Sequence, residues 1–217
     1  MIDAIQQRIV GVLVEKELTV PDAYPLTENS LLVGCNQKSN RDPEMSVTAT
    51  DLHPALLALR EDGWIVRVEG GGRVVRYRHK VMERLNIDRA QMIVMVELLL
   101  RGPQAPGALK PRIARMGLDL EPTQIEGVLS ALAAHQPVPL VERLPRRPRE
   151  RDHRYGHLLG PRPEPTHGDT DDGDDPGSPA LAAPRSGSAL EERVTRLESE
   201  LAELQRAVEA LRFAIGR

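Results

Sequence analysis

The spacing of hydrophobic residues divides the chain into three segments. Residues 1–158 mix apolar and charged side chains with helical spacing, whereas residues 159–187 are rich in Pro, Gly and Asp and contain almost no bulky apolar side chains. The composition of this middle segment predicts a disordered linker. In residues 188–217 apolar positions recur at alternating steps of four and three, which is the heptad pattern of a coiled coil.

Within the first segment, one order of elements is predicted twice: three helices followed by a β-hairpin. In the first copy the helices are expected over residues 3–17, 27–35 and 50–61, and the strands over 64–69 and 73–78. In the second copy the helices are expected over residues 89–100, 106–116 and 122–134, and the strands over 141–144 and 151–157. Each copy ends in an Arg-Tyr-x-His run, so we interpret the two copies as an internal duplication.

Local signals set the boundaries of these elements. Thr27 is a good helix N-cap, Gly63 is a natural C-terminal glycine, and Pro122 suits the first position of its helix. We expect the helix over 50–61 to begin at Thr50 or at the next residue, because that start leaves Pro54 in the first turn.

Three helices and a hairpin are the arrangement of a winged helix, whose third helix enters the DNA major groove while the hairpin reaches the backbone or minor groove. The sequence therefore predicts a mainly α protein with small β-hairpins, an α+β fold. Its parts are two tandem winged-helix domains at 1–86 and 87–158, the linker at 159–187, and a coiled-coil helix at 188–217.

The C-terminal helix has a narrow apolar seam. The seam residues are Leu190, Val194, Leu197, Leu201, Leu204, Val208, Leu211 and Ile215. Leu at the d positions with mostly β-branched residues at a favours a parallel two-stranded coil, and therefore a homodimer. The alternative is a single amphipathic helix that folds back onto the body, but the long linker and the narrow seam favour the dimer.

Composition limits the classes of function. Aromatic residues make up only 2% of the chain, so Leu, Val, Ile and Ala must build the core. Cys35 is the single cysteine, which excludes a disulfide within the chain and a cysteine-based metal site; it suits a small buried hydrophobe better than a redox sensor. The N-terminus lacks the pattern of a signal peptide, and the apolar runs are too short to span a membrane, so we expect a cytoplasmic protein.

The charge distribution weakens a DNA-binding interpretation. Residues 1–160 carry 22 Lys and Arg against 20 Asp and Glu, whereas residues 161–217 carry 7 against 12. A protein that follows DNA phosphates is usually more basic than this body.

Several runs resemble the YceH-like family of bacterial proteins. They are residues 13–19, 21–26, 35–43, 98–104, 144–146 and 154–155, and the nine-residue run at 35–43 is the most specific. The resemblance covers about residues 1–160 and leaves the linker and the coiled coil outside the shared part. It implies a tandem winged-helix fold, and it implies no enzymatic activity and no agreed ligand.

Arginines around the hairpins are the candidate DNA contacts. At the second hairpin they are Arg143, Arg146, Arg147, Arg149, Arg151 and Arg154, and at the first they are Arg73, Arg76 and Arg78. Arginines on a protruding hairpin suit phosphates or a narrow minor groove. The alternative is a solvated charged turn, which Glu142, Glu150 and Asp152 partly neutralise.

The 35–43 turn and the third helices are weaker candidates. Lys38 and Arg41 lie in an amide-rich turn that could contact phosphates, but an intramolecular role, in which the turn bonds its own backbone, is favoured. On the third helices the outward residues are expected to be Asp51, His53, Ala58 and Arg60, and then Thr123, Gln124, Glu126 and Ser130. Base reading by these faces is weakly supported, since Asp51 and Glu126 would repel phosphate.

Catalytic motifs and clustered metal ligands are absent from the sequence, so we predict neither an enzyme nor a cofactor or metal site. Three hypotheses remain. The first is a dimeric regulator that binds double-stranded DNA. The second is a protein-interaction scaffold, as in the tandem winged-helix subunits of chromosome-condensing complexes. The third is a repressor with a small-molecule pocket between the two units, for which the sequence singles out no residue.

Overall fold

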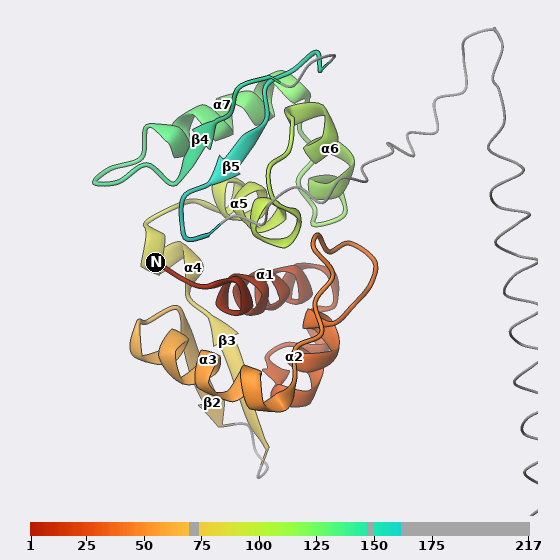
Figure 1. Cartoon of the computed structure of the whole chain (residues 1–217), viewed down its shortest axis with the longest axis vertical. Coiled ribbons are helices and arrows are strands. Elements are labelled where there is room, and N and C mark those ends of the chain that lie inside the picture. Colours follow the sequence, from red (N-terminus) through yellow and green to blue (C-terminus); the bar gives the residue numbers. More distant parts are fainter. Residues whose placement is uncertain (70–73, 147–149, 162–217) are drawn as a thin grey trace, which may run out of the picture. The chain divides into compact units, whose positions relative to one another are not determined.

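The computed structural model describes residues 1–69, 74–146 and 150–161. Its described part is an α+β fold of seven α-helices and two small antiparallel sheets, and the fold belongs to one compact unit, Met1–Gly168 (Figure 1). The predicted coiled coil, with its seam from Leu190 to Ile215, lies outside the described residues, as does most of the predicted linker. No helix of the described part is long and apolar enough to cross a membrane.

The first half of the fold contains three helices and a three-stranded sheet. Its elements are α1 (Ala4–Thr19), a 3-10 turn η1 (Pro21–Ala23), β1 (Leu26–Thr27), α2 (Glu28–Cys35), α3 (Ala49–Glu61), β2 (Ile65–Glu69) and β3 (Val75–His79). The sheet order is β1-β3-β2, and both pairings are antiparallel. We call the β2–β3 pair the first hairpin.

The second half repeats the plan after a one-turn connector. Its elements are α4 (Val81–Leu85), α5 (Arg89–Arg101), α6 (Pro106–Ala114), α7 (Pro122–Ala133), β4 (Val141–Arg143) and β5 (Tyr155–His157). In this second hairpin Arg143 lies opposite Tyr155 and Val141 lies opposite His157. The predicted order of helices and hairpins is therefore present in both halves.

Side-chain caps explain where several helices begin. Asp3, Thr48 and Asp88 each form a capping box with the residue three positions later, and the hydroxyl of Thr27 accepts from the Ser30 amide. These caps satisfy amide groups that a helix start leaves without partners. Gly63 follows α3 with a φ of 75°, the left-handed conformation that favours glycine.

Two expectations about local structure were wrong, and two short elements were not expected. The Thr48 cap starts α3 at Ala49, so Pro54 lies inside the helix and beyond its first turn. The returning strand of the second hairpin begins at Tyr155 instead of residue 151. The short elements β1 and α4 were not predicted, because each has too few residues to show a hydrophobic period.

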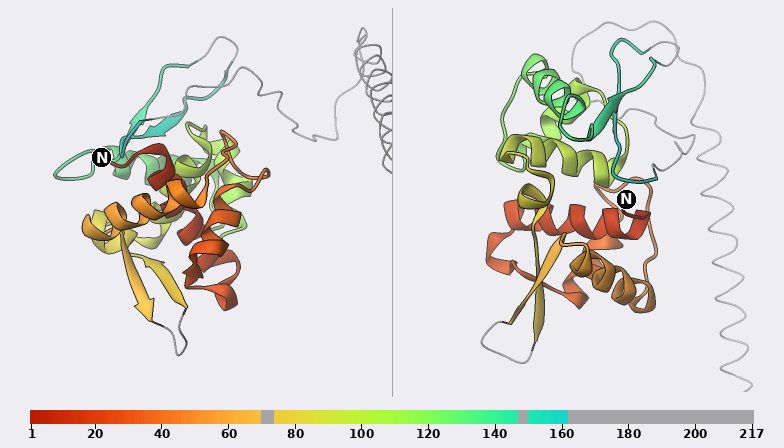
Figure 2. Two further views of the ribbon diagram at one scale, coloured as in Figure 1. Left: turned by 60° about the horizontal axis from the view of Figure 1, so that its bottom comes forward. Right: turned by 90° about the vertical axis from the view of Figure 1, so that its left-hand side faces the viewer.

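Two helices form the centre of the fold. All residues from Gln7 to Val14 of α1 are buried, and so are all residues from Met92 to Leu100 of α5. A helix that is buried on all sides lies inside the protein and is covered by other elements. Here α1 packs against α5, while α2 and α3 cover α1, and α6 and α7 cover α5, so one core serves both halves (Figures 1 and 2).

Candidate functional site: basic hairpins and a polar junction

The second hairpin presents three exposed arginines. Arg143, Arg146 and Arg151 are exposed, and Nη1 of Arg146 donates to the Arg151 carbonyl at 3.4 Å. Arg154 differs, because it is half-buried and its Nε lies 3.3 Å from the carboxylate of Glu150. The remaining predicted arginines of this hairpin, Arg147 and Arg149, lie outside the described residues.

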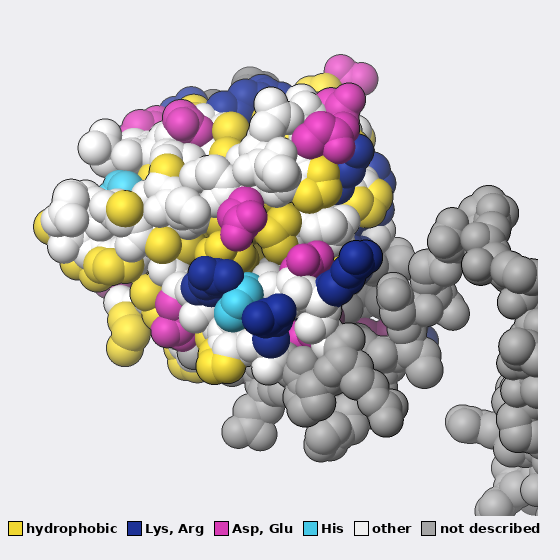
Figure 3. Space-filling model, turned by 90° about the horizontal axis from the view of Figure 1, so that it is seen from above, with side chains coloured by type: hydrophobic (Ala, Val, Ile, Leu, Met, Phe, Trp, Pro, Cys, Tyr) yellow, Lys and Arg dark blue, Asp and Glu magenta, His cyan; other side chains and the backbone are white. Residues whose placement is uncertain are grey.

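The charges on this end of the molecule are unevenly distributed. Figure 3 looks down on the half that contains α7 and the second hairpin, and basic side chains gather around a histidine on one side of this face. Acidic side chains lie beside this basic cluster as well as on the far side of the face, where further basic side chains border them. The basic cluster is therefore a local feature of this face, and a polyanion would meet both signs of charge around it.

The first hairpin is anchored by its tyrosine. The hydroxyl of Tyr77 donates to Oε1 of Glu28 on α2 at 2.7 Å, and the buried His79 pairs with Glu17 of α1. Arg76 is half-buried and donates to the Pro25 carbonyl at 2.8 Å, whereas Arg78 is exposed. Of the predicted contacts of this hairpin, only Arg78 is thus exposed in the described part, and Arg73 lies outside it.

The third helices expose mostly the residues expected to face outward. The exposed ones are Asp51, His53 and Arg60 on α3, and Thr123, Gln124, Glu126 and Ser130 on α7. Ala58 was expected to face outward but is half-buried. Asp51 is occupied in the capping box with Thr48, and the hydrogen bonds from Thr48 lower the pKa of its carboxyl group, so the negative charge persists on this face.

The 35–43 turn is held from within by Arg41. The side chain of Arg41 is fully buried, with its Nη2 at 2.5 Å and its Nη1 at 3.1 Å from the carboxylate oxygens of Glu15 on α1. Its Nε donates to the Gly34 carbonyl at 3.2 Å. This position removes Arg41 from contact with an external phosphate and fits the intramolecular role of the turn, whereas Lys38 remains exposed.

Arg8 holds the two ends of the same turn. From α1, it donates to the Cys35 carbonyl at 3.1 Å and to the Pro43 carbonyl at 2.6 Å. Burial, together with the nearby Arg41, lowers the pKa of Arg8 to about 10. Burial also raises the pKa of the Cys35 thiol to about 12, which fits the expected role of Cys35 as a small buried hydrophobe.

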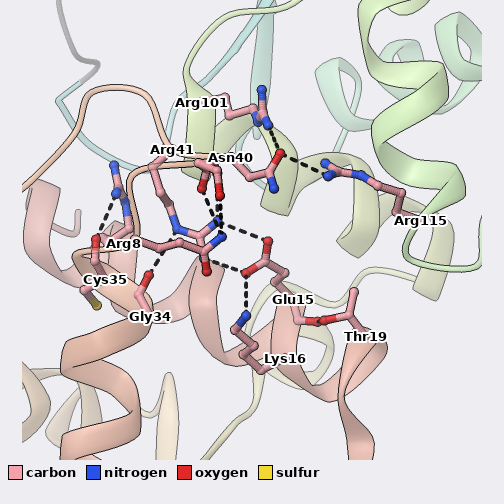
Figure 4. Close-up of polar contacts among 12 residues, drawn as sticks. Arg8, Glu15, Lys16, Thr19, Gly34, Cys35, Asn40, Arg41, Arg101 and Arg115 are labelled. Carbon is pink, nitrogen blue, oxygen red and sulfur yellow. Dashed lines mark hydrogen bonds and ion pairs between the residues drawn. The ribbon is translucent and has the colours of Figure 1, made fainter.

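The turn also reaches the second half of the protein, at a site that we call the polar junction. The amide of Asp42 donates to the Leu100 carbonyl of α5 at 2.9 Å. The side-chain oxygen of Asn40 accepts from Nη2 of Arg101, and it accepts from Nη1 of Arg115 at 3.0 Å. In Figure 4 Arg101 reaches Asn40 from above and Arg115 reaches it from the right, while Glu15 and Lys16 lie below it on α1.

A cavity of about 190 Å³ opens at the polar junction. Its lining residues are Glu15, Lys16, Thr19, Gln37, Asn40, Glu97, Arg112, Arg115 and Met116. Glu97 is 2% exposed, and its Oε2 lies 3.7 Å from Nε of Arg101. Burial, the largest influence, raises the pKa of Glu97, while Arg101 and the arginines beyond it oppose that rise.

Only an indirect signal for this cavity is present in the sequence. Three of the runs that carry the family resemblance, at residues 13–19, 35–43 and 98–104, meet at the junction. Arg112 and Arg115 lie in none of those runs, and no spacing links them to Asn40, which is 75 residues from Arg115.

These features define an α+β protein whose two similar helical halves share one core, each half ending in a basic hairpin. Comparison with known proteins identifies the family. The chain belongs to the family described as a protein of unknown function, DUF480, whose model matches residues 2–150. This membership fits the resemblance found in the sequence.

Relatives of the chain match over most of their length. The chain is 40% identical to the UPF0502 protein of Geobacter sulfurreducens over 94% of this chain and 90% of the relative. It is 36% identical to the UPF0502 protein of Serratia proteamaculans over 97% of this chain and 95% of the relative. Matches of this extent pass residue 160, so the C-terminal segment, which we expected to lie outside the shared part, is at least partly included.

Proposed function

We propose that this protein is a DNA-binding regulator built from two winged-helix units that bind double-stranded DNA as a homodimer. The carrying observation is that Arg143, Arg146 and Arg151 are all exposed on the second hairpin, which follows the third helix of its half. In a winged helix this hairpin lies beside the third helix at the DNA surface.

The third helix of the second half supports the same proposal. Its exposed face offers the side chains of Thr123, Gln124 and Ser130, which can donate and accept hydrogen bonds at base edges. Glu126 on this face accepts from the Tyr155 hydroxyl at 3.3 Å, so one of its acidic oxygens has an internal partner.

The test is the salt dependence of DNA binding by the full chain. Binding is measured by the fluorescence anisotropy of a labelled duplex. The double variant Arg146→Gln/Arg151→Gln is expected to bind more weakly on every sequence. The slope of log affinity against log salt should fall by roughly 0.9 for each phosphate contact that is lost.

The matched control removes two exposed arginines that lie outside both hairpins. Arg84 lies on α4 and Arg89 on α5, and Arg84→Gln/Arg89→Gln changes the net charge by the same amount. Equal losses in the two double variants would mean that net charge alone governs binding, and would refute a role for the second hairpin.

Sequence preference is tested by recovering bound fragments of genomic DNA at near-physiological salt. Enrichment of a few loci that share an inverted repeat is the result expected for a dimeric regulator, because its two-fold symmetry is mirrored in the binding site. The seam in residues 190–215 supports the dimer. Sedimentation equilibrium of Leu197→Asp/Leu204→Asp should then give half the mass of the unchanged chain.

A protein-interaction scaffold is the second candidate. The nearly balanced charge of residues 1–160 and the exposed carboxylates of Asp51 and Glu126 on the third helices favour it. A specific protein partner, recovered by a chain that shows no DNA affinity above background, is the outcome that would select the scaffold over the regulator.

A further inference from the structure

The polar junction carries more positive than negative charge. Its cations are Lys16, Arg41, Arg101, Arg112 and Arg115, and the carboxylates that line its cavity are Glu15 and Glu97. A third carboxylate, that of Asp42, interacts with a further cation, Arg8. Glu15 is fully engaged, because Arg41 binds both of its oxygens and Lys16 lies 3.9 Å from one of them. The remaining three arginines surround the single carboxylate of Glu97.

Two of these arginines donate to amide oxygens, which are neutral. Nη1 of Arg112 donates to Oε1 of Gln104, and Nη1 of Arg115 donates to Oδ1 of Asn40. Arg101 shares the same Asn40 oxygen and lies near Glu97. The charge of two guanidinium groups at this cavity is therefore not balanced by a carboxylate, although their hydrogen bonds are partly made.

We propose that the cavity at the polar junction binds a small molecule that carries a carboxylate or phosphate group. Guanidinium groups bind both kinds of oxyanion through paired, charge-assisted hydrogen bonds. The volume of about 190 Å³ is smaller than that of typical sites for drug-sized ligands, so the ligand is a compact anion of few atoms. This inference is independent of DNA binding.

Position at the end of a helix explains only part of the cluster. Arg112 lies in the last turn of α6 and Arg115 caps that helix, and cations are favourable at a helix C-terminus. The same effect does not account for Lys16, which reaches the cavity from α1, or for Asn40, whose oxygen draws Arg101 and Arg115 together. Polar side chains from α1, from the 35–43 turn and from the end of α6 therefore meet at one opening. Such a convergence of cations is suited to binding an anion.

The first experiment measures binding of inorganic phosphate and of citrate to the full chain by isothermal titration calorimetry, with sodium chloride at matched ionic strength as the reference. The unchanged protein is expected to bind one of these probes saturably. Arg115→Gln should weaken that binding at least about tenfold, the size expected for losing one charge-assisted hydrogen bond. Arg60→Gln, which removes an exposed arginine of α3, a helix that contributes no residue to the cavity lining, should leave binding unchanged.

A second variant places a carboxylate in the site. Asn40→Asp substitutes a negative oxygen for the neutral one that Arg101 and Arg115 share, and Asp, like Asn, tolerates the positive φ of 60° at this position. This variant is expected to raise the melting temperature in plain buffer and to lose the response to the anion.

The outcomes of these experiments distinguish anion binding at the cavity from a general stabilising effect of salt. Phosphate and citrate stabilise most proteins by exclusion from the surface, and that effect would be equal in all variants. The proposal is overturned if neither probe binds saturably, or if Arg115→Gln and Asn40→Asp bind as the unchanged protein does. Loss of DNA binding in another variant would not affect this result.

Discussion

Gly11 is a buried glycine in the middle of α1, at the point where α1 meets α5. A Cβ atom added at this position would lie 2.6 Å from Cδ2 and 2.8 Å from Cγ of Leu100. The Leu100 side chain is 1% exposed and is enclosed by the core. Gly127 on α7 is the natural comparison, since it is also helical but exposed, and an added Cβ would meet nothing within 4 Å.

Replacing each of the two glycines by alanine should change the stability of the protein differently. Replacing a helical glycine by alanine is favourable by roughly 1 kcal/mol through helix propensity, and both variants receive this gain. Only Gly11→Ala also overpacks the core, which costs about 1–3 kcal/mol. The free energy of unfolding should therefore rise by about 1 kcal/mol in Gly127→Ala and fall, or at best stay level, in Gly11→Ala.

Urea unfolding of the two full-length variants measures this difference. Far-UV circular dichroism reports the helices, and the fluorescence of Trp64, the single tryptophan, reports the base of the first hairpin. The midpoints are compared at unchanged slope, because a change in slope would indicate a different unfolded state. The argument fails if Gly11→Ala is as stable as Gly127→Ala, since α1 and α5 would then not be in close contact at this point.

Three further predictions concern buried polar groups. Cys35, whose thiol pKa burial raises to about 12, should react with a disulfide reagent at pH 8 far more slowly in the native protein than in urea, and equal rates would show that the thiol is accessible. Glu97→Gln should flatten the pH dependence of stability measured by urea unfolding at pH 5 and pH 8. Burial raises the pKa of Glu97, so its contribution is fully present below the unfolded value of about 4.3 and is lost as pH rises through the folded pKa. Arg41→Leu should lower the free energy of unfolding by about 3–5 kcal/mol, because it leaves the carboxylate of Glu15 without its main partner, and Arg41→Leu/Glu15→Leu should recover part of that loss; no recovery would argue against the pair.

The parts of the fold that sequence reasoning predicted depend on local signals. Thr27 caps α2, Gly63 follows α3 with a positive φ, and Pro122 is the first residue of α7, as expected. Each signal acts within one or two turns of the chain, so neighbouring residues are sufficient to read it. Pro54 lies deeper in α3 than expected because Thr48, an equally local signal, caps the helix and starts it at Ala49, one residue before Thr50.

The polar junction depends on contacts that the sequence does not encode locally. Arg41 resembles a phosphate contact when read in its turn, but its partner Glu15 lies 26 residues earlier on another helix. Asn40 meets Arg101 and Arg115 only because α1 and α5 pack against each other and bring the turn beside α6. The family-specific run at 35–43 therefore contains residues that lie at the polar junction, but the run alone does not reveal their contacts.

The shared core changes how the two halves can act. Because α1 and α5 pack against each other within one continuous core, the two halves cannot separate without exposing apolar surface, at a cost of about 25 cal/mol for each Å². The two hairpins are consequently held at a fixed spacing. An anion bound at the junction would lie where the turn of the first half touches α5 and the end of α6. It could influence both hairpins only by a small repacking of this contact, since a close-packed core transmits strain and does not hinge.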